Sequence, residues 1–323
     1  MENNDASNIE LSVIAPMYNE EKIIQESIKK MLSAVEQLTI KWEVIFVNDG
    51  STDKTLQIAE ETTKDNKYAR VISYNKNRGR GYALRTGFSH SKGRYVVTTE
   101  SDMTWGETVI DRLYTELKNS RAEVVIASPY AEGGTLENVP LKRAFLSRLG
   151  NQILRRTIPG KITMLSGMTR GYVGDFIRNV PLEQDRKEIH LEIVSKASIL
   201  NADFSEIPVT LRWEPPSKDK PKRKSSFKAG RLIISHLLFG FNEAPIMLFG
   251  TIGGMSMLGG LTTGFYLSYL YFIRGEVIGD RVALILTTIF LILTGLSAFL
   301  FCFLSYQIKF LRQELFKLQV KKP

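Results

Sequence analysis

Four short polar segments combine carboxylates, amides and glycines in a way that suits phosphate and metal chemistry. They occupy residues 16–20, 48–53, 77–83 and 100–102. Glu100 and Asp102 are carboxylates at positions i and i+2, which repel each other unless a cation lies between them. Mg²⁺ and Mn²⁺ prefer such oxygen ligands. Gly79 and Gly81 carry no side chain, so we expect their backbone to approach a phosphate closely.

These four segments follow predicted strands. Strand patterns at residues 11–15, 42–48, 69–73, 94–99 and 123–128 alternate with amphipathic stretches at 21–38, 54–63 and 107–118. Such alternation favours a parallel, doubly wound sheet, which binds ligands beyond the carboxyl ends of its strands. An isolated Asp-Gly-Ser is usually only a turn with a helix cap. The order of all four segments along one sheet is what predicts a site.

Two long apolar runs follow the soluble part. Residues 244–273 and 282–308 contain no charged residue over 30 and 27 positions. Each run exceeds the roughly 20 residues that span a bilayer core. Neither is N-terminal, so neither is a signal peptide. We therefore expect a hairpin of two transmembrane helices.

The net charge of +9 is concentrated beside these runs. Residues 217–231 hold seven Lys and Arg against a single Asp, and residues 309–323 hold five against a single Glu. The remainder is close to neutral, which argues against a nucleic-acid surface. The positive-inside rule places both basic segments in the cytoplasm. The single cysteine and the three dispersed histidines exclude a disulfide framework and a zinc site built from cysteines.

The ordered motifs resemble those of the family 2 glycosyltransferases with the GT-A fold. More narrowly, residues 11 to about 230 resemble the polyprenyl-phosphate glycosyltransferases, the dolichol-phosphate mannose synthase group. The resemblance implies an α/β fold with a GT-A type, doubly wound, mostly parallel sheet, followed by the two-helix hairpin. It implies a membrane-anchored inverting enzyme that moves a sugar from a UDP- or GDP-linked donor to dolichyl or undecaprenyl phosphate. It also implies Mg²⁺ or Mn²⁺ as a cofactor.

The resemblance assigns roles to individual residues. The metal ligands are Glu100 and Asp102, which are also catalytic together with Arg170. The donor-binding residues are Pro16, Tyr18, Asn19, Glu20, Asp49, Ser51, Arg78, Gly79 and Ser101. The residues expected to hold the acceptor phosphate are Arg143, Arg148, Arg212, Ser226 and Lys228.

Three positions depart from the family pattern. Glu100 and Thr163 stand where aspartate is usual, and Thr104 stands where the metal motif usually continues with Gln or His. Two alternatives therefore stay open: a family 2 transferase with another lipid or a polysaccharide as acceptor, and a catalytically silent scaffold of the same fold. Val209 stands in place of the Gln of the Gln-x-x-Arg-Trp signature, which argues against a processive polysaccharide synthase.

The predicted organisation has four parts. Residues 1–213 form a cytoplasmic GT-A catalytic domain, and residues 214–243 form a basic linker with a juxtamembrane amphipathic helix. Residues 244–308 form the multi-pass membrane anchor, and residues 309–323 form a basic cytoplasmic tail. Small residues four apart at Gly250–Gly254 and Gly260–Gly264 permit homo-oligomers through the membrane helices.

Overall fold

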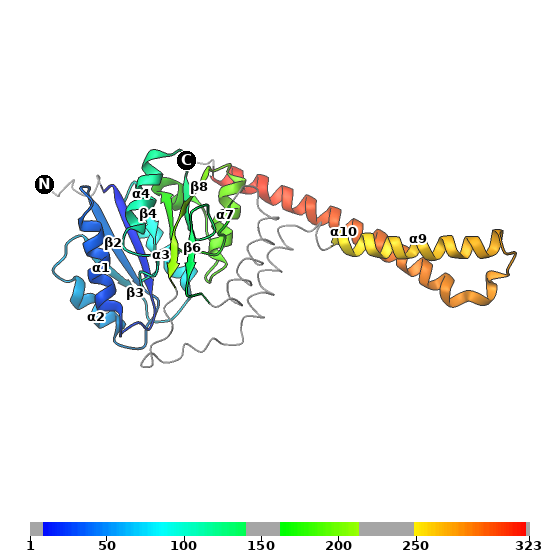
Figure 1. The fold of residues 1–323 in the computed structure, drawn as a ribbon, viewed down its shortest axis with the longest axis horizontal. Helices are drawn as coiled ribbons and strands as arrows, with labels where there is room; N and C mark the ends of the chain where they lie inside the picture. The colour runs from blue at the N-terminus through cyan, green and yellow to red at the C-terminus, as the bar shows by residue number, and fades with distance from the viewer. Residues whose placement is uncertain (1–8, 140–161, 213–248, 321–323) are drawn as a thin grey trace. The chain divides into compact units, whose positions relative to one another are not determined.

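A computed structural model describes residues 9–139, 162–212 and 249–320. The chain divides into two compact units, residues 1–226 and residues 227–323. The first unit contains a seven-stranded sheet with helices and a small two-stranded sheet (Figure 1). The described part of the second, residues 249–320, contains two long helices.

Strands and helices alternate through the first half of the first unit. The elements are β1 (Leu11–Met17), α1 (Ile24–Glu36), β2 (Trp42–Asn48), α2 (Thr55–Thr63), β3 (Ala69–Ser73), α3 (Arg80–His90), β4 (Tyr95–Thr98), α4 (Val109–Asn119) and β5 (Val124–Ser128). All five predicted strands are confirmed, with bounds that shift by two residues at most. The periodicity succeeded because these strands are short, apolar and bounded by polar turns.

The second half completes the sheet with one reversed strand. It contains β6 (Thr135–Glu137), β7 (Arg170–Val173), α6 (Gly174–Asn179), α7 (Ile189–Ile199), β8 (Phe204–Pro208) and β9 (Thr210–Arg212). The sheet order is β3-β2-β1-β4-β7-β5-β8. Only β7 runs antiparallel to its neighbours, β4 and β5, so the sheet is mostly parallel as predicted. Strands β6 and β9 pair separately in a parallel register.

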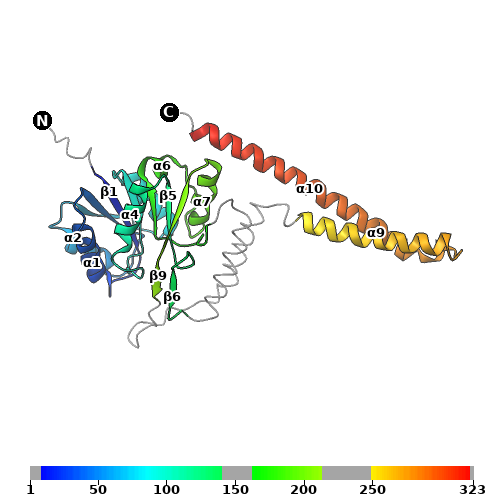
Figure 2. The ribbon, with the colours of Figure 1, turned by 45° about the horizontal axis from the view of Figure 1, so that its top comes forward.

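Helices cover both faces of the large sheet. Successive residues of β1, β2, β4 and β5 are nearly all buried, and successive side chains point to opposite faces. Helix α1 packs against α2 and α4 (Figure 2). Helix α3 packs against α6. The loops after β1, β2 and β4 therefore meet at one edge of the sheet, since parallel strands end on the same side.

The second unit is an antiparallel pair of helices, α9 (Thr251–Phe272) and α10 (Val282–Val320), joined by a short turn with the 3₁₀ helix η3 (Ile278–Arg281). The helices approach closely at glycines: a Cβ on Gly260 would lie 2.7 Å from Cγ1 of Ile292. The Thr288 hydroxyl donates to Oγ1 of Thr263 across the pair at 2.8 Å. Gly260 therefore serves packing within the chain.

Only one helix in the described ranges is long and apolar enough to cross a membrane. It covers Gly279–Phe316, with a mean hydropathy of 2.4 in its most apolar window. Helix α9 is less apolar, because glycine, serine and threonine are interspersed among its apolar residues. The hairpin exists as a pair of packed helices, but the structure does not support 244–273 as a second span to the same degree. Residues 309–320, predicted as a separate tail, continue α10 instead.

Candidate active site

The loops after β1 and β2 interlock through side chains predicted to bind the donor. The backbone N–H of Asn19 donates to Oγ of Ser51 at 3.0 Å, and the Asn19 side-chain oxygen accepts from the N–H of Thr52 at 2.8 Å. The N–H of Glu20 donates to Oγ1 of Thr55 at 2.7 Å. Asn19 has a positive φ of 53°, a conformation that asparagine adopts more readily than most residues. These bonds fix both loops beside each other at the sheet edge.

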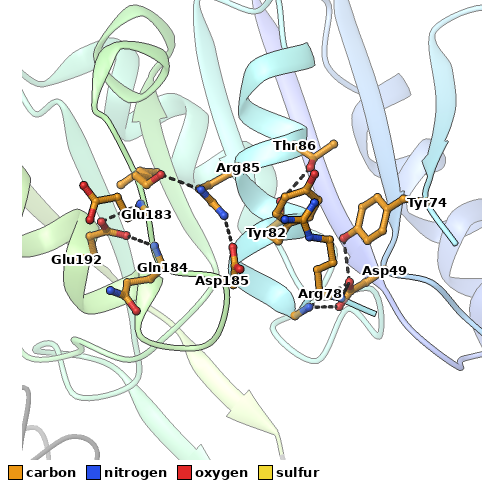
Figure 3. A network of polar contacts seen from close by, with 12 residues as sticks. Asp49, Tyr74, Arg78, Tyr82, Arg85, Thr86, Glu183, Gln184, Asp185 and Glu192 are labelled. Carbon is orange, nitrogen blue, oxygen red and sulfur yellow. Dashed lines mark hydrogen bonds and ion pairs between the residues drawn. The ribbon is translucent and has the colours of Figure 1, made fainter. Parts of the chain in front are cut away.

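Asp49 has a carboxylate that is engaged within the protein (Figure 3). It accepts from the Tyr74 hydroxyl at 2.9 Å, from Nδ2 of Asn77 at 3.0 Å, and from the N–H groups of Arg78 at 2.8 Å and Gly79 at 3.0 Å. A carboxylate has about four acceptor sites, so these bonds use most of them. Asp49 is buried. Burial, and then the bond to Asp49, raises the pKa of the Tyr74 hydroxyl. Asp49 thus holds the loop that leads into α3.

The glycines of that loop are explained by a contact within the chain. Gly79 has φ +104°, and a Cβ there would lie 2.5 Å from the carbonyl oxygen of Asp185. A Cβ on Gly81 would lie 2.3 Å from the carbonyl oxygen of Gln184. This contact accounts for the missing side chains, and the close approach of the two glycines to a phosphate stays a prediction. They make room for the segment that precedes α7.

The side chain of Arg78 lies on the ring of Tyr82. Its guanidinium carbon is 3.5 Å from the ring centroid, a stacked cation–π arrangement (Figure 3). Tyr74 meets the same ring edge-on, with centroids 5.1 Å apart. Arg78 is exposed, so the stacking orients its N–H groups at the surface of the site.

Glu100 and Asp102 are brought together by a turn. Strand β4 ends at Thr98, so neither carboxylate belongs to the strand. Instead Oγ1 of Thr104 lies 3.1 Å from Oε2 of Glu100 and 2.8 Å from Oδ1 of Asp102. Nε1 of Trp105 also donates to Oε2 of Glu100, at 3.2 Å. Thr104 therefore bridges the pair.

Residues next to this turn connect it to the loop after β1 and to the start of α3. The hydroxyl of Ser101 donates to Oε2 of Glu20, and Nη1 of Arg80 lies 3.8 Å from Oε1 of Glu100. Met103 has a positive φ of 51°. Such backbone strain concentrates at functional sites, where surrounding contacts maintain it.

The donor set at Glu100 and Asp102 fits a hard divalent cation. Oδ2 of Asp102 has no hydrogen bond to any residue in the described ranges, and Oε1 of Glu100 has only the distant Arg80. The structure shows no cluster of three or more His, Cys, Asp or Glu side chains there or elsewhere in these ranges. Two carboxylates leave most of an octahedral shell to water and to phosphate oxygens, which is how Mg²⁺ is usually bound.

The chain's family is decided by comparison with known proteins. The family model described as "Glycosyl transferase family 2" matches residues 12–179, which is more than half of the chain and contains the loops after β1, β2, β3 and β4. The chain belongs to glycosyl transferase family 2. It is a glycosyltransferase.

Curated relatives of this glycosyltransferase include two polyprenyl-phosphate enzymes. A dolichol-phosphate mannosyltransferase of Pyrococcus furiosus is 27% identical over 249 residues, 76% of this chain and 68% of the relative. A dodecaprenyl-phosphate galacturonate synthase of Rhizobium johnstonii is 25% identical over 309 residues, 92% of this chain and 88% of the relative.

Among solved structures, a glucosyl-3-phosphoglycerate synthase of Mycobacterium tuberculosis in complex with UDP is similar. The TM-score is 0.53 at 18% identity, covering 72% of this chain and 80% of the other. Another structure of that protein contains Mn²⁺, UDP and glucosyl-3-phosphoglycerate, with a TM-score of 0.52. At this identity the likeness shows the GT-A fold, and it confirms the predicted fold class of the soluble unit.

Arg170, predicted to be catalytic, does not lie at the surface of the protein. Its side chain is fully buried, and it donates to the carbonyl oxygens of His190 at 3.0 Å and Leu165 at 2.6 Å. Burial lowers the pKa of its guanidinium. A side chain inside the protein cannot reach a substrate phosphate, so the catalytic role predicted for Arg170 is not supported. It connects the loop before β7 to the start of α7.

Thr163, where the family usually has aspartate, has a defined structural role. Its hydroxyl donates to Oε2 of Glu206 at 2.8 Å and lies 2.6 Å from Oγ of Ser128. Its N–H donates to Oε1 of Glu206 at 2.8 Å. An aspartate here would place a second carboxylate against Glu206, which would be repulsive. The departure is thus matched to its surroundings.

The remaining acceptor residues are only partly placed. Nε of Arg212 donates to Oε2 of Glu137 at 2.8 Å in an exposed pair between β9 and β6. Arg143, Arg148, Ser226 and Lys228 lie outside the described residues. Among the donor residues, Pro16 lies within β1 and Tyr18 is 44% exposed next to Asn19.

Sequence reasoning missed several side chains that organise the site. Tyr74, Tyr82, Arg80 and Thr104 lie within or beside the predicted motifs but were given no role. Glu192, whose carboxylate accepts from the N–H groups of Glu183 and Gln184, was missed because it lies on α7, far along the chain. Gly79 and Gly81 were the available signal. Two closely spaced glycines indicate that another backbone segment approaches closely, but they do not identify that segment.

Proposed function

We propose that the protein is a membrane-anchored, inverting glycosyltransferase that moves a sugar from a UDP- or GDP-linked donor to a polyprenyl phosphate. The observation that carries this proposal is the similarity to the dodecaprenyl-phosphate galacturonate synthase over 92% of the chain, because it extends beyond the soluble unit into the apolar helices. An acceptor with a long apolar tail requires the enzyme to work at a membrane surface.

The donor would bind at the sheet edge formed by the loops after β1, β2 and β4. Glu100 and Asp102 would hold Mg²⁺ or Mn²⁺, and the ion would neutralise charge on the diphosphate leaving group. Asn19 and Ser51 fix the first loops, Asp49 holds the approach to α3, and Arg78 presents a cation beside them. Their common effect is to orient the donor before reaction.

In the proposed reaction a phosphate oxygen of the acceptor attacks the anomeric carbon of the sugar. The bond from that carbon to the diphosphate oxygen breaks, and the nucleoside diphosphate leaves with the bonding electron pair. A single displacement inverts the anomeric configuration. The second pKa of a phosphate monoester is about 6, so the acceptor is mostly a dianion at pH 7. It requires positioning and charge compensation rather than a general base.

The predicted multi-pass membrane anchor belongs to this proposal. Helix α10 has the length and hydropathy to cross a bilayer, and its exposed apolar side chains include Phe290, Leu300 and Phe303. Helix α9 packs along it and exposes Phe265, Tyr269 and Phe272. We propose that both helices enter the membrane, with the soluble unit on the cytoplasmic side.

Incubation of the purified protein with labelled nucleotide sugars, Mn²⁺ and undecaprenyl or dolichyl phosphate in detergent tests the function. An acid-labile sugar phospholipid supports the proposal. A base-labile glycolipid or a polysaccharide product would instead indicate another acceptor. Absence of turnover with every donor and lipid would leave the silent scaffold, with Glu100 and Thr163 as the departures that motivate it.

A further inference from the structure

Residues 181–188, between α6 and α7, form a segment that is bound tightly across the start of α3. The carboxylate of Glu192 accepts from the N–H groups of Glu183 and Gln184, both at 2.9 Å. From the α3 side, Nη1 of Arg85 donates to the carbonyl oxygen of Leu182 at 3.0 Å. Figure 3 shows these contacts converging from two elements far apart in sequence. The segment therefore has a defined position next to the donor loops.

Further contacts fix the register of the segment against α3. Arg85 is paired with Asp185, and the N–H of Tyr82 donates to the carbonyl oxygen of Asp185 at 3.1 Å. Gly79 and Gly81 leave no space there, since a Cβ would meet backbone oxygens at 2.5 and 2.3 Å. A shift of one residue would break these bonds, so the next residue, at position 186, is also fixed.

Arg186 is consequently placed against the donor loop. Its Cγ lies 3.3 Å from the position that a Cβ on Gly79 would take. Arg186 is exposed, and its side chain forms no ion pair with any residue in the ranges that the structure describes. The nearby Asp185 and Asp49 do not neutralise it, because Asp185 is paired with Arg85 and Asp49 accepts bonds from its own loop.

Gly79 has Arg78 and Arg80 as chain neighbours and the Cγ of Arg186 close by in space. Arg78 is stacked on Tyr82 through its face, which leaves its in-plane N–H groups available. Arg80 is 3.8 Å from Glu100, at the candidate metal turn. Arg80 thus has a carboxylate partner, whereas Arg78 and Arg186 form no ion pair within the described ranges. A multiply charged anion beside Gly79 would be attracted to these two side chains and could accept bidentate hydrogen bonds from them.

We propose that Arg186 binds a substrate phosphate group. This inference rests on the proposed function, because a nucleotide sugar and a polyprenyl phosphate both present phosphate to the site. The link from Gly79 through Arg80 to Glu100 favours the donor diphosphate. Arg186 is therefore a binding residue contributed by the segment before α7, which none of the sequence motifs contains.

The test measures binding of UDP and of GDP, each with Mn²⁺, to wild type, Arg186→Ala and Arg186→Lys by calorimetry. A charge-assisted hydrogen bond contributes roughly ten- to hundredfold in affinity. We expect Arg186→Ala to weaken binding of the better nucleotide by that factor, and Arg186→Lys to recover part of the loss. Arg121→Ala is the control, because Arg121 is exposed before β5, at the opposite edge of the sheet. Thermal unfolding midpoints show that the variants are folded.

A second arm measures the dependence of transfer on undecaprenyl phosphate concentration. An increased KM for the lipid with unchanged nucleotide binding would still support a phosphate contact, but with the acceptor. Arg186→Ala equal to wild type in both arms would overturn the inference while leaving the proposed function intact. Nucleotide binding that depends on Arg186, in a wild type that glycosylates no polyprenyl phosphate, would support the inference and overturn the proposed acceptor.

Discussion

At the residue scale, the chemistry depends on where each charge is neutralised. The two carboxylates at the metal turn keep oxygens available, because Thr104 and Trp105 occupy only part of their acceptor capacity. Asp49 and Arg170 differ, since each is buried and bonded within the protein. Charged residues that look alike in the sequence motifs therefore differ in the structure. Glu100 and Asp102 keep oxygens available to a ligand, whereas Asp49 and Arg170 use their polar atoms for bonds within the protein.

Substitution of Asp102 tests the metal turn. Asp102→Asn removes a negative charge from a site for a hard cation, so we expect loss of turnover and of metal-dependent nucleotide affinity. Glu100→Asp should retain activity, because it keeps the carboxylate that the family usually has, whereas Glu100→Gln should be worse. Calorimetry with and without Mn²⁺ compares the variants. The metal assignment would be refuted if the nucleotide affinity of wild type were the same with and without Mn²⁺ and Asp102→Asn had that same affinity.

His190 gives the stability a dependence on pH. The side chain is buried, both ring nitrogens lack hydrogen-bond partners within the described residues, and Arg170, Arg80 and Lys187 are nearby cations. Burial first, and then these cations, lowers the pKa of His190 well below 6.5. The folded state therefore stays unprotonated while the unfolded state binds a proton below pH 6.5. Its contribution to stability is complete above that pH and decreases as the pH falls.

The expected loss is up to about 1.4 kcal/mol per pH unit below that point. Chemical unfolding of wild type and His190→Leu between pH 7.5 and 5 measures it. The wild type should lose more stability on acidification than the variant, since leucine does not titrate. Parallel curves for the two proteins would show that His190 does not control this dependence.

At the element scale, close backbone approach decides which segments meet. In the soluble unit, the segment before α7 lies against the start of α3 because Gly79 and Gly81 lack side chains. In the helix pair, Gly260 has the same effect on α9 and α10. These contacts explain why the small-residue spacing on α9 is not by itself a sign of self-association. Oligomerisation through these helices stays a prediction.

Gly260 and Gly254 form a matched pair of variants on α9. A Cβ on Gly260 would lie 2.7 Å from the Ile292 side chain and 3.1 Å from its backbone nitrogen, whereas a Cβ on Gly254 would meet nothing within 4 Å. We expect Gly260→Ala to destabilise the helix pair by about 1–3 kcal/mol through overpacking. Gly254→Ala should be neutral or stabilising, because alanine favours helix. Unfolding in detergent micelles compares them, and equal effects would argue against this helix packing.

At the scale of the whole molecule, the basic segments and the apolar helices together predict an orientation. The positive-inside rule places residues 1–243 and the end of the chain in the cytoplasm, with the turn between α9 and α10 on the far side. In that turn Arg274 and Arg281 both form ion pairs with Glu276, and Asp280 brings the net charge to zero. A balanced turn offers little resistance to translocation.

Accessibility labelling tests the orientation after replacing Cys302, the single native cysteine, by serine. We expect a cysteine at Gly275 to react with an impermeant reagent added outside intact cells. A cysteine at Lys321 should react only after permeabilisation. Equal labelling of both positions from outside would contradict the hairpin topology.

The local pattern of the sequence was sufficient for the strands, for the loops that carry polar residues and for the family. Short apolar runs bounded by turn residues determine β1 to β5 almost independently of the rest of the chain. Parallel strands then bring the loops to one edge. Each motif begins within a few residues of the end of its strand. Glu100, Asp102, Asn19 and Ser51 could therefore be assigned to the same edge of the sheet without a structure.

Burial and long-range partners could be decided only by the tertiary structure. The sequence singled out Asp49, Arg170, Gly79 and Gly81 for contacts with substrates. That role stays a prediction for Asp49, Gly79 and Gly81, whereas Arg170 is fully buried. The folded chain uses them for contacts with segments up to about a hundred residues away. Nothing local reveals such a partner, because a buried charge and an exposed one look the same until the element that covers it is known. The same physical reason hid Arg186, which reaches the donor loop only through the segment bound across α3.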